Sequence, residues 1–200
     1  MFLRANNPRR PLTAITGGIG TGKSVVSRLL RIMGYRVYDC DERARWVMTH
    51  DALLRQQLTA LFGPETYLPT AVPTLNKPYL AQQIFSSPDA LQQVNACVHP
   101  AVARDLLASD VEFFESAILF ESHFAQLVPP AEVWTVSAPL ELRIARAMAR
   151  DHASRDQVLE RIASQLPQAD KECRADHVIL NDDRHSIIRQ IHNILATSHA

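Results

Sequence analysis

Glycine and lysine are scarce in this 200-residue chain, which contains six glycines and three lysines beside 18 arginines. Lys plus Arg and Asp plus Glu are equal, at 21 each. The balance leaves no net positive field with which to hold nucleic acid or an anionic membrane. Any anion must therefore be bound by a local arrangement of groups, and we expect no nucleic-acid partner.

Cysteine is also scarce, and long apolar runs are absent. Cys40, Cys97 and Cys173 are odd in number, widely spaced and without a CxxC pair, so they fit neither a disulfide framework nor a zinc site. No segment approaches 18 consecutive apolar residues, and the charged N-terminus MFLRANNPRRP lacks the apolar stretch of a signal peptide. We therefore expect a cytoplasmic protein with no membrane partner.

The length and the 46% hydrophobic content suit one globular domain, with or without a sizeable insertion. Periodicity predicts a strand at Leu12–Thr16, a helix at Lys23–Met33 that Gly34 ends, and a strand at Arg36–Tyr38. A strand, a glycine-rich loop, a helix and a second strand are typical of a crossover in a parallel sheet. The fold class is therefore α/β.

The remaining elements follow from the same patterns. A long helix is expected over Asp41–Phe62, and half of the twelve prolines lie between Pro64 and Pro100, in a segment that reads as an insertion. A proline inside a helical pattern predicts an interruption or kink at His99-Pro100. The other predicted helices are Leu80–Phe85, Leu91–Leu107, Leu140–Arg150, Ser154–Gln165 and Arg184–Ala196, and the other strands are Phe113–Leu119, Val133–Ser137 and His177–Leu180.

Four of the six glycines lie in Gly17–Ser24, which matches the phosphate-loop pattern GxxxxGK[ST] between a strand and a helix. Glycines let successive N–H groups point into one concavity, and the helix N-terminus adds positive potential. Lys23 would reach the β and γ phosphates, and Ser24 would ligate Mg²⁺. The predicted ATP-binding residues of this loop are Gly18, Ile19, Gly20, Thr21, Gly22, Lys23 and Ser24. A glycine-rich turn without a ligand is the alternative.

The sequence also narrows the class of nucleotide-binding protein. It contains no DxxG or NKxD segment of a GTPase switch and no LSGGQ-like segment of a transporter ATPase. A small kinase needs instead an acceptor cavity, a base near the end of a neighbouring strand, and cations around the transferred phosphoryl group. Asp39 follows the second strand and is a candidate for that base. It is equally a candidate helix cap with Glu42 three residues on, and position alone leaves both open.

Five segments resemble the dephospho-coenzyme A kinase family. They are TGGIGTGKS from Thr16, DCDERAR from Asp39, VNACVHP from Val94, ILFES from Ile118, and a series from Leu140 through Arg146, Arg150, Arg161, Gln165, Lys171, Asp176 and Asn181. The resemblance implies a P-loop NTPase fold, with a parallel five-stranded sheet flanked by helices, a helical acceptor-binding insertion and a helical lid. It also implies that ATP, with Mg²⁺, phosphorylates the ribose 3′-hydroxyl of dephospho-CoA to give coenzyme A.

The resemblance implies roles for three residues on the acceptor side. Asp39 would be the base that accepts the proton of the ribose hydroxyl, and Arg45 and His99 would help to hold dephospho-CoA. The alternatives are a core histidine that breaks a helix for His99 and a solvated helix face for Arg45. Tyr38 and Trp46 would either pack on the substrate or belong to the core.

Arg143, Arg146 and Arg150 are spaced so that their guanidinium groups can project from one side of a helix toward phosphates. Arg146 and Arg150 match family positions in the lid and are predicted to bind ATP, whereas Arg143 replaces a frequent glutamine. A solvated basic face is the alternative. Glu115 stands where the family commonly has an aspartate, so we do not assign it as a magnesium ligand.

These observations predict a single P-loop kinase domain over residues 1–200. It would comprise a core (about 10–60, 111–139 and 175–200), an acceptor-binding helical region (about 60–110) and a lid (about 140–172). Lys23, Asp39 and Arg146 are the predicted catalytic residues, and the protein would be a monomer or small homo-oligomer. The rival hypotheses are another small-molecule or nucleoside monophosphate P-loop kinase, and a non-catalytic nucleotide-binding module.

Overall fold

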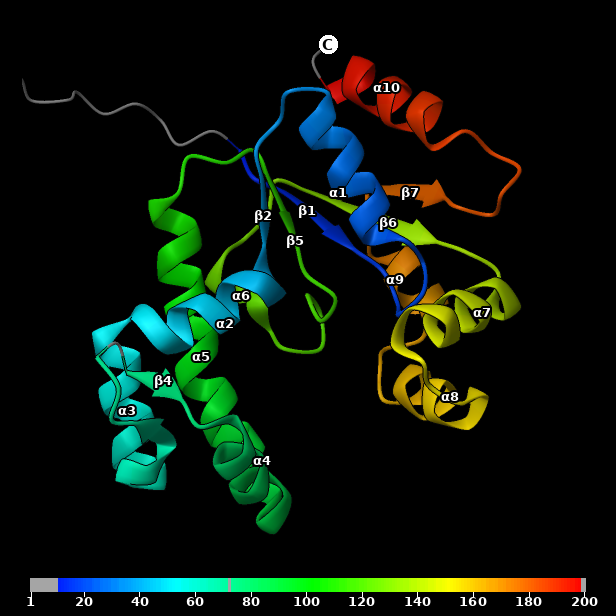
Figure 1. The fold of residues 1–200 in the computed structure, drawn as a ribbon. Coiled ribbons are helices and arrows are strands. Elements are labelled where there is room, and N and C mark those ends of the chain that lie inside the picture. Colours follow the sequence, from blue (N-terminus) through cyan, green and yellow to red (C-terminus); the bar gives the residue numbers. More distant parts are fainter. Residues whose placement is uncertain (1–10, 72, 199–200) are drawn as a thin grey trace, which may run out of the picture. The chain divides into compact units, whose positions relative to one another are not determined.

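A computed structural model describes residues 11–71 and 73–198 of the chain (Figure 1). The N-terminal segment considered above for a signal peptide lies, up to residue 10, outside the described residues. The described chain forms two compact units. Unit 1 comprises the residues up to Tyr38, Asp110–Ala125 and the residues from Pro129 onward, and unit 2 comprises Asp39–Ser109 with Gln126–Val128.

Unit 1 is built on a five-stranded sheet with the strand order β2-β5-β1-β6-β7. The strands are β1 (Thr13–Thr16), β2 (Val37–Asp39), β5 (Phe113–Glu115), β6 (Glu132–Ser137) and β7 (His177–Leu180). The central strand β1 pairs in parallel with both β5 and β6, in a register that sets Ile15 beside Glu115 and Trp134. The predicted parallel sheet and α/β class are confirmed. Strand β5 is shorter than predicted because residues beyond Ser116 turn away from the sheet.

Helices cover both faces of this sheet. On one face α1 (Lys23–Ile32) and α10 (Ile187–Ser198) pack on the sheet, and Val26, Ile191 and Trp134 share one buried cluster there (Figure 1). On the other face lies α9 (Gln168–Cys173), where the hydroxyl of Thr135 donates to the carbonyl of Lys171 over 3.3 Å. Because side chains alternate along β6, Trp134 and Thr135 mark opposite faces.

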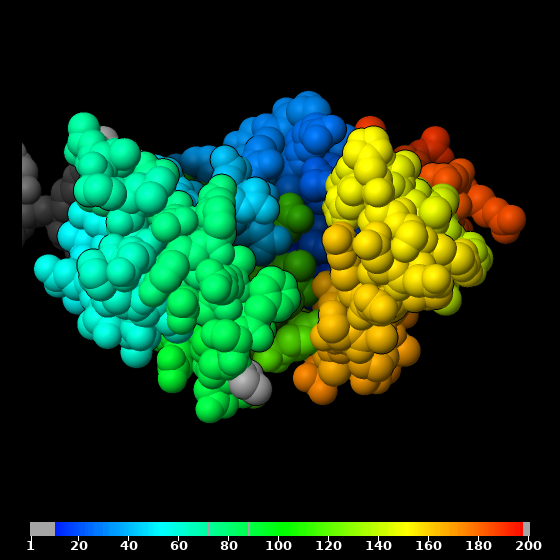
Figure 2. All heavy atoms as spheres, turned by 60° about the horizontal axis from the view of Figure 1, so that its bottom comes forward, coloured from blue at the N-terminus to red at the C-terminus, as the bar shows by residue number. Residues whose placement is uncertain are grey.

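Two further helices of unit 1 follow β6. They are α7 (Leu140–Asp151) and α8 (Arg155–Ala163), which contact each other. In Figure 2 they form the yellow region, and the orange segment that follows them leads into α9. Ile144, Ala147 and Val158 form their small buried cluster. A capping box begins α8, because the Ser154 and Gln157 side chains each accept a backbone N–H of the other residue.

Unit 2 is mainly helical. Its helices are α2 (Cys40–His50), α3 (Ala52–Phe62), a 3-10 turn η1 (Pro64–Thr66), α4 (Lys77–Ser86) and α5 (Pro88–Ala108). Its two strands, β3 (Tyr67–Leu68) and β4 (Thr74–Leu75), form a hairpin. The short helix α6 (Phe124–Leu127) has its first two residues in unit 1 and its last two in unit 2. Arg43 joins α2 to α5 through two hydrogen bonds to Asp105, of 2.7 and 2.8 Å. The segment from Asp39 to Phe62 belongs to unit 2.

Two helix predictions in unit 2 are wrong in detail. The single helix expected over Asp41–Phe62 is two helices, because Asp51 adopts an extended backbone and caps α3, its carboxylate accepting the N–H of Leu54 over 2.9 Å. Conversely, α5 runs through Pro100, so of the two alternatives predicted there, an interruption or a kink, the interruption is wrong. Val98 and Ala101, which precede and follow this proline in the sequence, are buried, so tertiary burial offsets the roughly 3 kcal/mol that proline costs in a helix. Within the described residues, no helix is both long and apolar enough to cross a membrane.

Candidate active site

The predicted phosphate loop connects β1 to α1 in unit 1. Gly20 and Gly22 have φ angles of 77° and 93°, in the left-handed region that suits glycine. The surrounding residues also leave no room for a side chain at these positions. A Cβ at Gly20 would collide with the backbone carbonyl of Arg143, and one at Gly22 with the side-chain nitrogen of Asn181. The loop therefore fits closely against α7 and against the residue that follows β7.

Lys23 and Thr21 fold back over this loop. The ammonium group of Lys23 donates to the carbonyls of Gly17 and Gly18 at 3.0 and 3.3 Å, and the Thr21 hydroxyl donates to the Gly18 carbonyl at 2.9 Å. Lys23 is also the first residue of α1, where the N–H groups of the first turn lie outside the helical ladder and the dipole is positive. The loop thus places a cation beside an anion-binding helix end.

Ser24 follows Lys23 and its side chain is exposed. One turn further along α1, the hydroxyl of Ser27 donates to the carboxylate of Glu115 over 2.7 Å. Glu115 ends β5, the strand next to β1, so a carboxylate stands at the carboxyl edge of the sheet near the start of α1. This edge is where open α/β sheets bind ligands.

Two arginines of α7 face the loop. Arg143 is buried, at 6% exposure, and its Nε donates to the carbonyl of Ile19 over 3.0 Å. Burial lowers the pKa of this guanidinium, and the charge of Glu172 partly opposes the shift. Arg146 donates to the backbone carbonyl of Asn181 at 3.0 Å, and Asn181 in turn donates to the carbonyl of Thr21 at 2.8 Å. Arg146 is therefore one residue removed from the loop.

Arg150 points elsewhere. Its guanidinium makes two hydrogen bonds to Asp151, of 2.7 and 2.9 Å, and its side chain is 63% exposed. Asp151 also accepts a hydrogen bond from Arg161. The arginine series expected to converge is thus divided: Arg143 binds the loop, Arg146 binds Asn181 and pairs with Asp183 at 2.7 Å, and Arg150 pairs with Asp151. The most buried of the three is Arg143, which the sequence analysis did not favour.

Asp39 caps helix α2. Its Oδ1 accepts the N–H groups of both Asp41 and Glu42 at 3.0 Å, so the capping alternative is realised. Both bonds end on the same oxygen. A carboxylate has two oxygens with about four acceptor sites, so capping by Oδ1 is compatible with Oδ2 accepting a proton.

The other acceptor-side candidates lie on two helices of unit 2 that pack together, since α2 carries Arg45 and α5 carries His99. Arg45 is exposed, while His99 is half-buried and burial lowers the pKa of its imidazole. Trp46 is 43% exposed, so it does not belong to the core, and its ring lies between the guanidinium of Arg43 and the ring of His50. Tyr38, by contrast, is buried.

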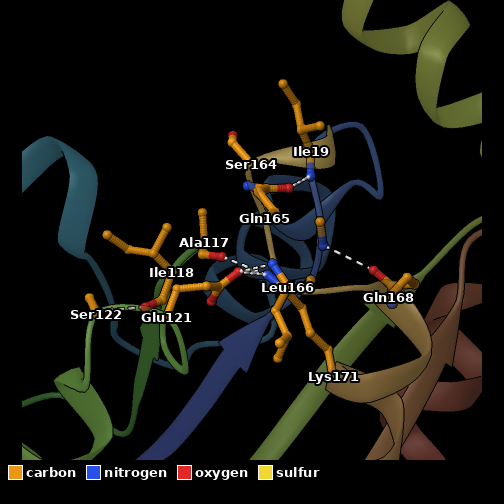
Figure 3. A network of polar contacts seen from close by, with 12 residues as sticks. Ile19, Ala117, Ile118, Glu121, Ser122, Ser164, Gln165, Leu166, Gln168 and Lys171 are labelled. Atoms are coloured by element: carbon orange, nitrogen blue, oxygen red, sulfur yellow. Dashed lines mark hydrogen bonds and ion pairs between the residues drawn. The ribbon is translucent and has the colours of Figure 1, made fainter. Parts of the chain in front are cut away.

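Sequence reasoning gave no role to several groups that touch the loop. The side-chain oxygens of Gln165 and Gln168 accept the N–H groups of Ile19 and Gly18, at 2.8 and 3.1 Å (Figure 3). Asn181 holds Thr21, as described above, and also lines an open surface pocket of about 460 Å³ with Leu29 and the segment Asp183–Ile188. Gln165 and Asn181 belong to the segments that carry the family resemblance, which was the available signal, whereas Gln168 had none.

The chain is similar to known proteins over nearly its whole length. The dephospho-CoA kinase family model matches residues 12–186. A dephospho-CoA kinase of Porphyromonas gingivalis is 43% identical over 190 residues, which cover 92% of each chain. A crystal structure of a Thermus thermophilus protein superposes with a TM-score of 0.80 at 32% identity, over 96% of this chain and 99% of that one. The structure of dephospho-CoA kinase from Campylobacter jejuni, 22% identical, shares the fold at a TM-score of 0.65, over 94% and 97% of the two chains.

Proposed function

Because this chain belongs to the dephospho-CoA kinase family, we propose that it transfers the γ-phosphoryl group of ATP to the ribose 3′-hydroxyl of dephospho-CoA, giving ADP and coenzyme A. The predicted family, P-loop fold and enzyme class, an ATP-dependent kinase, are confirmed by the comparisons. The observation that carries the proposal is the phosphate loop, which ends at the N-terminus of α1 with Lys23 and Ser24 in the first turn.

The loop supplies electrostatic stabilisation. The transition state of phosphoryl transfer spreads negative charge over the equatorial oxygens, so fixed N–H dipoles and cations lower its energy more than that of the ground state. Lys23 would exchange its two carbonyl partners for the β and γ phosphates, which are stronger acceptors because they are charged. Arg146 would contribute a guanidinium from α7, next to Asn181.

Magnesium is the expected counter-ion of the triphosphate. Mg²⁺ usually keeps several waters and takes only one or two protein ligands beside the phosphates. The exposed hydroxyl of Ser24 at the start of α1 suits that role. When bound, the ion would neutralise phosphate charge. Glu115 is held by Ser27 and remains unassigned as a ligand.

Asp39 would act as the base on the acceptor side. The 3′-oxygen of the ribose attacks the γ-phosphorus, the bond from that phosphorus to the β–γ bridging oxygen breaks, and the hydroxyl proton passes to the carboxylate. ADP leaves with the electron pair of the broken bond. The capping bonds to Oδ1 fix the carboxylate and favour proton transfer to Oδ2.

The remaining roles follow from the same proposal. Arg45 and His99 would hold dephospho-CoA in the helical acceptor region, and a histidine kept neutral by burial would do so by hydrogen bonding. Arg150 would bind ATP after leaving Asp151, as part of a lid formed by α7 and α8. The open pocket beside Asn181 has room for a nucleoside base. We propose a cytoplasmic enzyme that acts as a monomer or small homo-oligomer.

The decisive experiment measures ADP release by the purified protein with ATP and Mg²⁺, with and without dephospho-CoA. We expect strong stimulation by dephospho-CoA and none by coenzyme A, whose 3′-position is already phosphorylated. Nucleoside monophosphates and shikimate serve as alternative acceptors. Stimulation by one of these alone would indicate another small-molecule kinase, and ATP binding without stimulated release would indicate a nucleotide-binding module.

A further inference from the structure

Two glutamines from one short segment hold the backbone of the phosphate loop. Gln165 lies in the connection between α8 and α9, and Gln168 is the first residue of α9. They bind the consecutive N–H groups of Ile19 and Gly18, some 150 residues away in sequence. Figure 3 shows both side chains pointing at the loop from this one segment of the chain. Two side chains aimed at adjacent peptide groups restrict the loop more than either bond alone, because they fix two successive peptide units.

The Ile19 residue is held from two directions. Its N–H donates to Gln165 Oε1 over 2.8 Å, while its carbonyl accepts from the buried Nε of Arg143 over 3.0 Å. Gln168 is oriented as well, since its Nε2 donates to Glu172 at 3.0 Å and to the carbonyl of Val136 at 3.3 Å. Because Glu172 and the Val136 carbonyl are both acceptors, the Nε2 of Gln168 must face them, and its Oε1 therefore faces the N–H of Gly18.

The segment that carries the glutamines has a buried anchor. Lys171 has no exposed surface, and its ammonium group lies 2.6 Å from Glu121 Oε1 and 3.1 Å from the carbonyl of Ala117. The same carboxylate oxygen accepts the N–H of Leu166, between the two glutamines, at 3.0 Å. The backbone that presents the glutamines is thereby fixed at both ends of residues 166–171 (Figure 3).

Glutamine is the side chain that suits this position chemically. An acceptor for the loop N–H groups is needed, and a carboxylate would be the stronger one. A carboxylate beside a bound triphosphate would, however, repel it, because like charges a few ångströms apart in a partly buried site interact strongly. A neutral amide oxygen satisfies the N–H groups without opposing the ligand.

We propose that Gln165 and Gln168 are positioning residues, which hold Gly18 and Ile19 so that the following residues, Gly20 to Ser24, present their N–H groups to the phosphates before ATP arrives. The inference rests on the proposed function only in that the loop must bind ATP. A preformed loop does not have to be ordered on binding, so the glutamines should raise affinity for the nucleotide. Because they act equally before and during transfer, they should alter KM for ATP and not kcat.

The test replaces Gln165 with methionine, which keeps the length of the side chain and removes its hydrogen-bonding groups. We expect Gln165→Met to weaken ATP binding in calorimetric titration about three- to tenfold, the equivalent of one lost hydrogen bond, and to raise KM for ATP by the same factor with kcat within about twofold. Exchange of the Ile19 amide, followed by NMR without nucleotide, should accelerate by a similar factor. Gln168→Met should do the same to the Gly18 amide.

The matched control is Gln157→Met, which removes a glutamine side chain that accepts the Ser154 N–H at 2.9 Å in the capping box of α8. It should leave KM for ATP within about twofold, because that bond does not touch the loop. Gln165→Glu supplies a second arm: the Ile19 amide should stay protected, whereas ATP affinity should fall through repulsion.

Three results would overturn the inference. The first is tighter ATP binding by Gln165→Met, which would make the glutamine a competitor of the phosphates. The second is unchanged exchange at Ile19, and the third is an unchanged KM in both methionine variants. Failure of the wild-type protein to bind ATP or to transfer phosphate to dephospho-CoA would instead refute the proposed function, so the two failures are distinguishable.

Discussion

Replacing Lys171 with methionine would break the buried ion pair that anchors the glutamine segment. Removing one partner of a buried pair costs about 3–5 kcal/mol, because the remaining charge stays buried without its counter-ion. Glu121 would keep the N–H of Leu166 at 3.0 Å, and its side chain is 20% exposed, so the lower end applies. We expect Lys171→Met to lower the free energy of unfolding of unit 1 by about 3 kcal/mol.

The assay exploits the two tryptophans of the chain. Trp134 is buried in the main cluster of unit 1, whereas Trp46 is exposed in unit 2. In a Trp46→Phe background, fluorescence during urea unfolding therefore reports unit 1. A double-mutant cycle with Glu121→Gln should give a coupling of about 2 kcal/mol, within the range for directly bonded groups.

The pH dependence provides the sharper check. Burial of the Glu121 carboxyl raises its pKa, but the hydrogen bonds from Lys171 and Leu166 outweigh burial and hold the pKa below its ordinary value. In the wild type this carboxylate contributes stability above its unfolded pKa, and the contribution is lost as pH falls through the folded pKa. Without Lys171, burial dominates, so the carboxyl pKa rises above its ordinary value and the variant loses stability as pH increases.

The stability difference between the wild type and Lys171→Met should therefore shrink as the pH is lowered from about 7 to about 4. The variant regains stability by protonating Glu121, while the wild type loses the ion pair. A difference that stays constant over this range, or stability losses that simply add in the double variant, would refute the assigned coupling between Lys171 and Glu121.

Three further predictions concern catalysis. Asp39→Asn should lower turnover about 10²- to 10⁴-fold, which is the usual contribution of a general base. ATP affinity and the cap on α2 should persist, because asparagine caps helices as well as aspartate does. Unchanged turnover in the ADP-release assay would remove Asp39 from the mechanism. Lys23→Ala should weaken ATP binding by about tenfold or more through the loss of a charged hydrogen bond to phosphate, and ordinary affinity in a calorimetric titration would contradict its role. Arg146→Ala should lower kcat about 10²-fold, whereas Arg150→Ala should raise KM for ATP and leave kcat within about twofold. Equal effects of the two substitutions on kcat would argue against separate roles for Arg146 in transfer and Arg150 in ATP binding.

The sequence was sufficient to predict the elements whose signals are local. The phosphate loop combines rare glycines with a strand before it and an amphipathic helix after it, and strand β7 was predicted with its observed bounds, His177–Leu180. The break at Asp51 was missed because the apolar pattern continues across it, and only the capping bond to Leu54 distinguishes two helices from one. Pro100 led to the prediction of a helix interruption that does not occur, because the packing of α5 overrides the local preference of proline against helix interiors.

The candidate site divides along similar lines. Lys23 and Ser24 are fixed by a motif, so their placement at the start of α1 was predictable. Gln165, Gln168 and Arg143 contact the loop across more than 120 residues, and no spacing rule connects such distant positions. Uncharged amides also leave no charge pattern to detect. Asp39 was ambiguous for a different reason, because a helix cap and a catalytic carboxylate have the same sequence signature.

The central place of β1 in the sheet has a consequence for synthesis on the ribosome. Thr13 and Ala14 pair with Phe113 and Phe114 on one side and with Glu132 and Val133 on the other, so the first strand made has no partner until about a hundred more residues have emerged. The glutamines that secure the loop come later still. A nascent chain thus carries its most recognisable motif long before the neighbouring strands and the glutamines that support this motif have been synthesised.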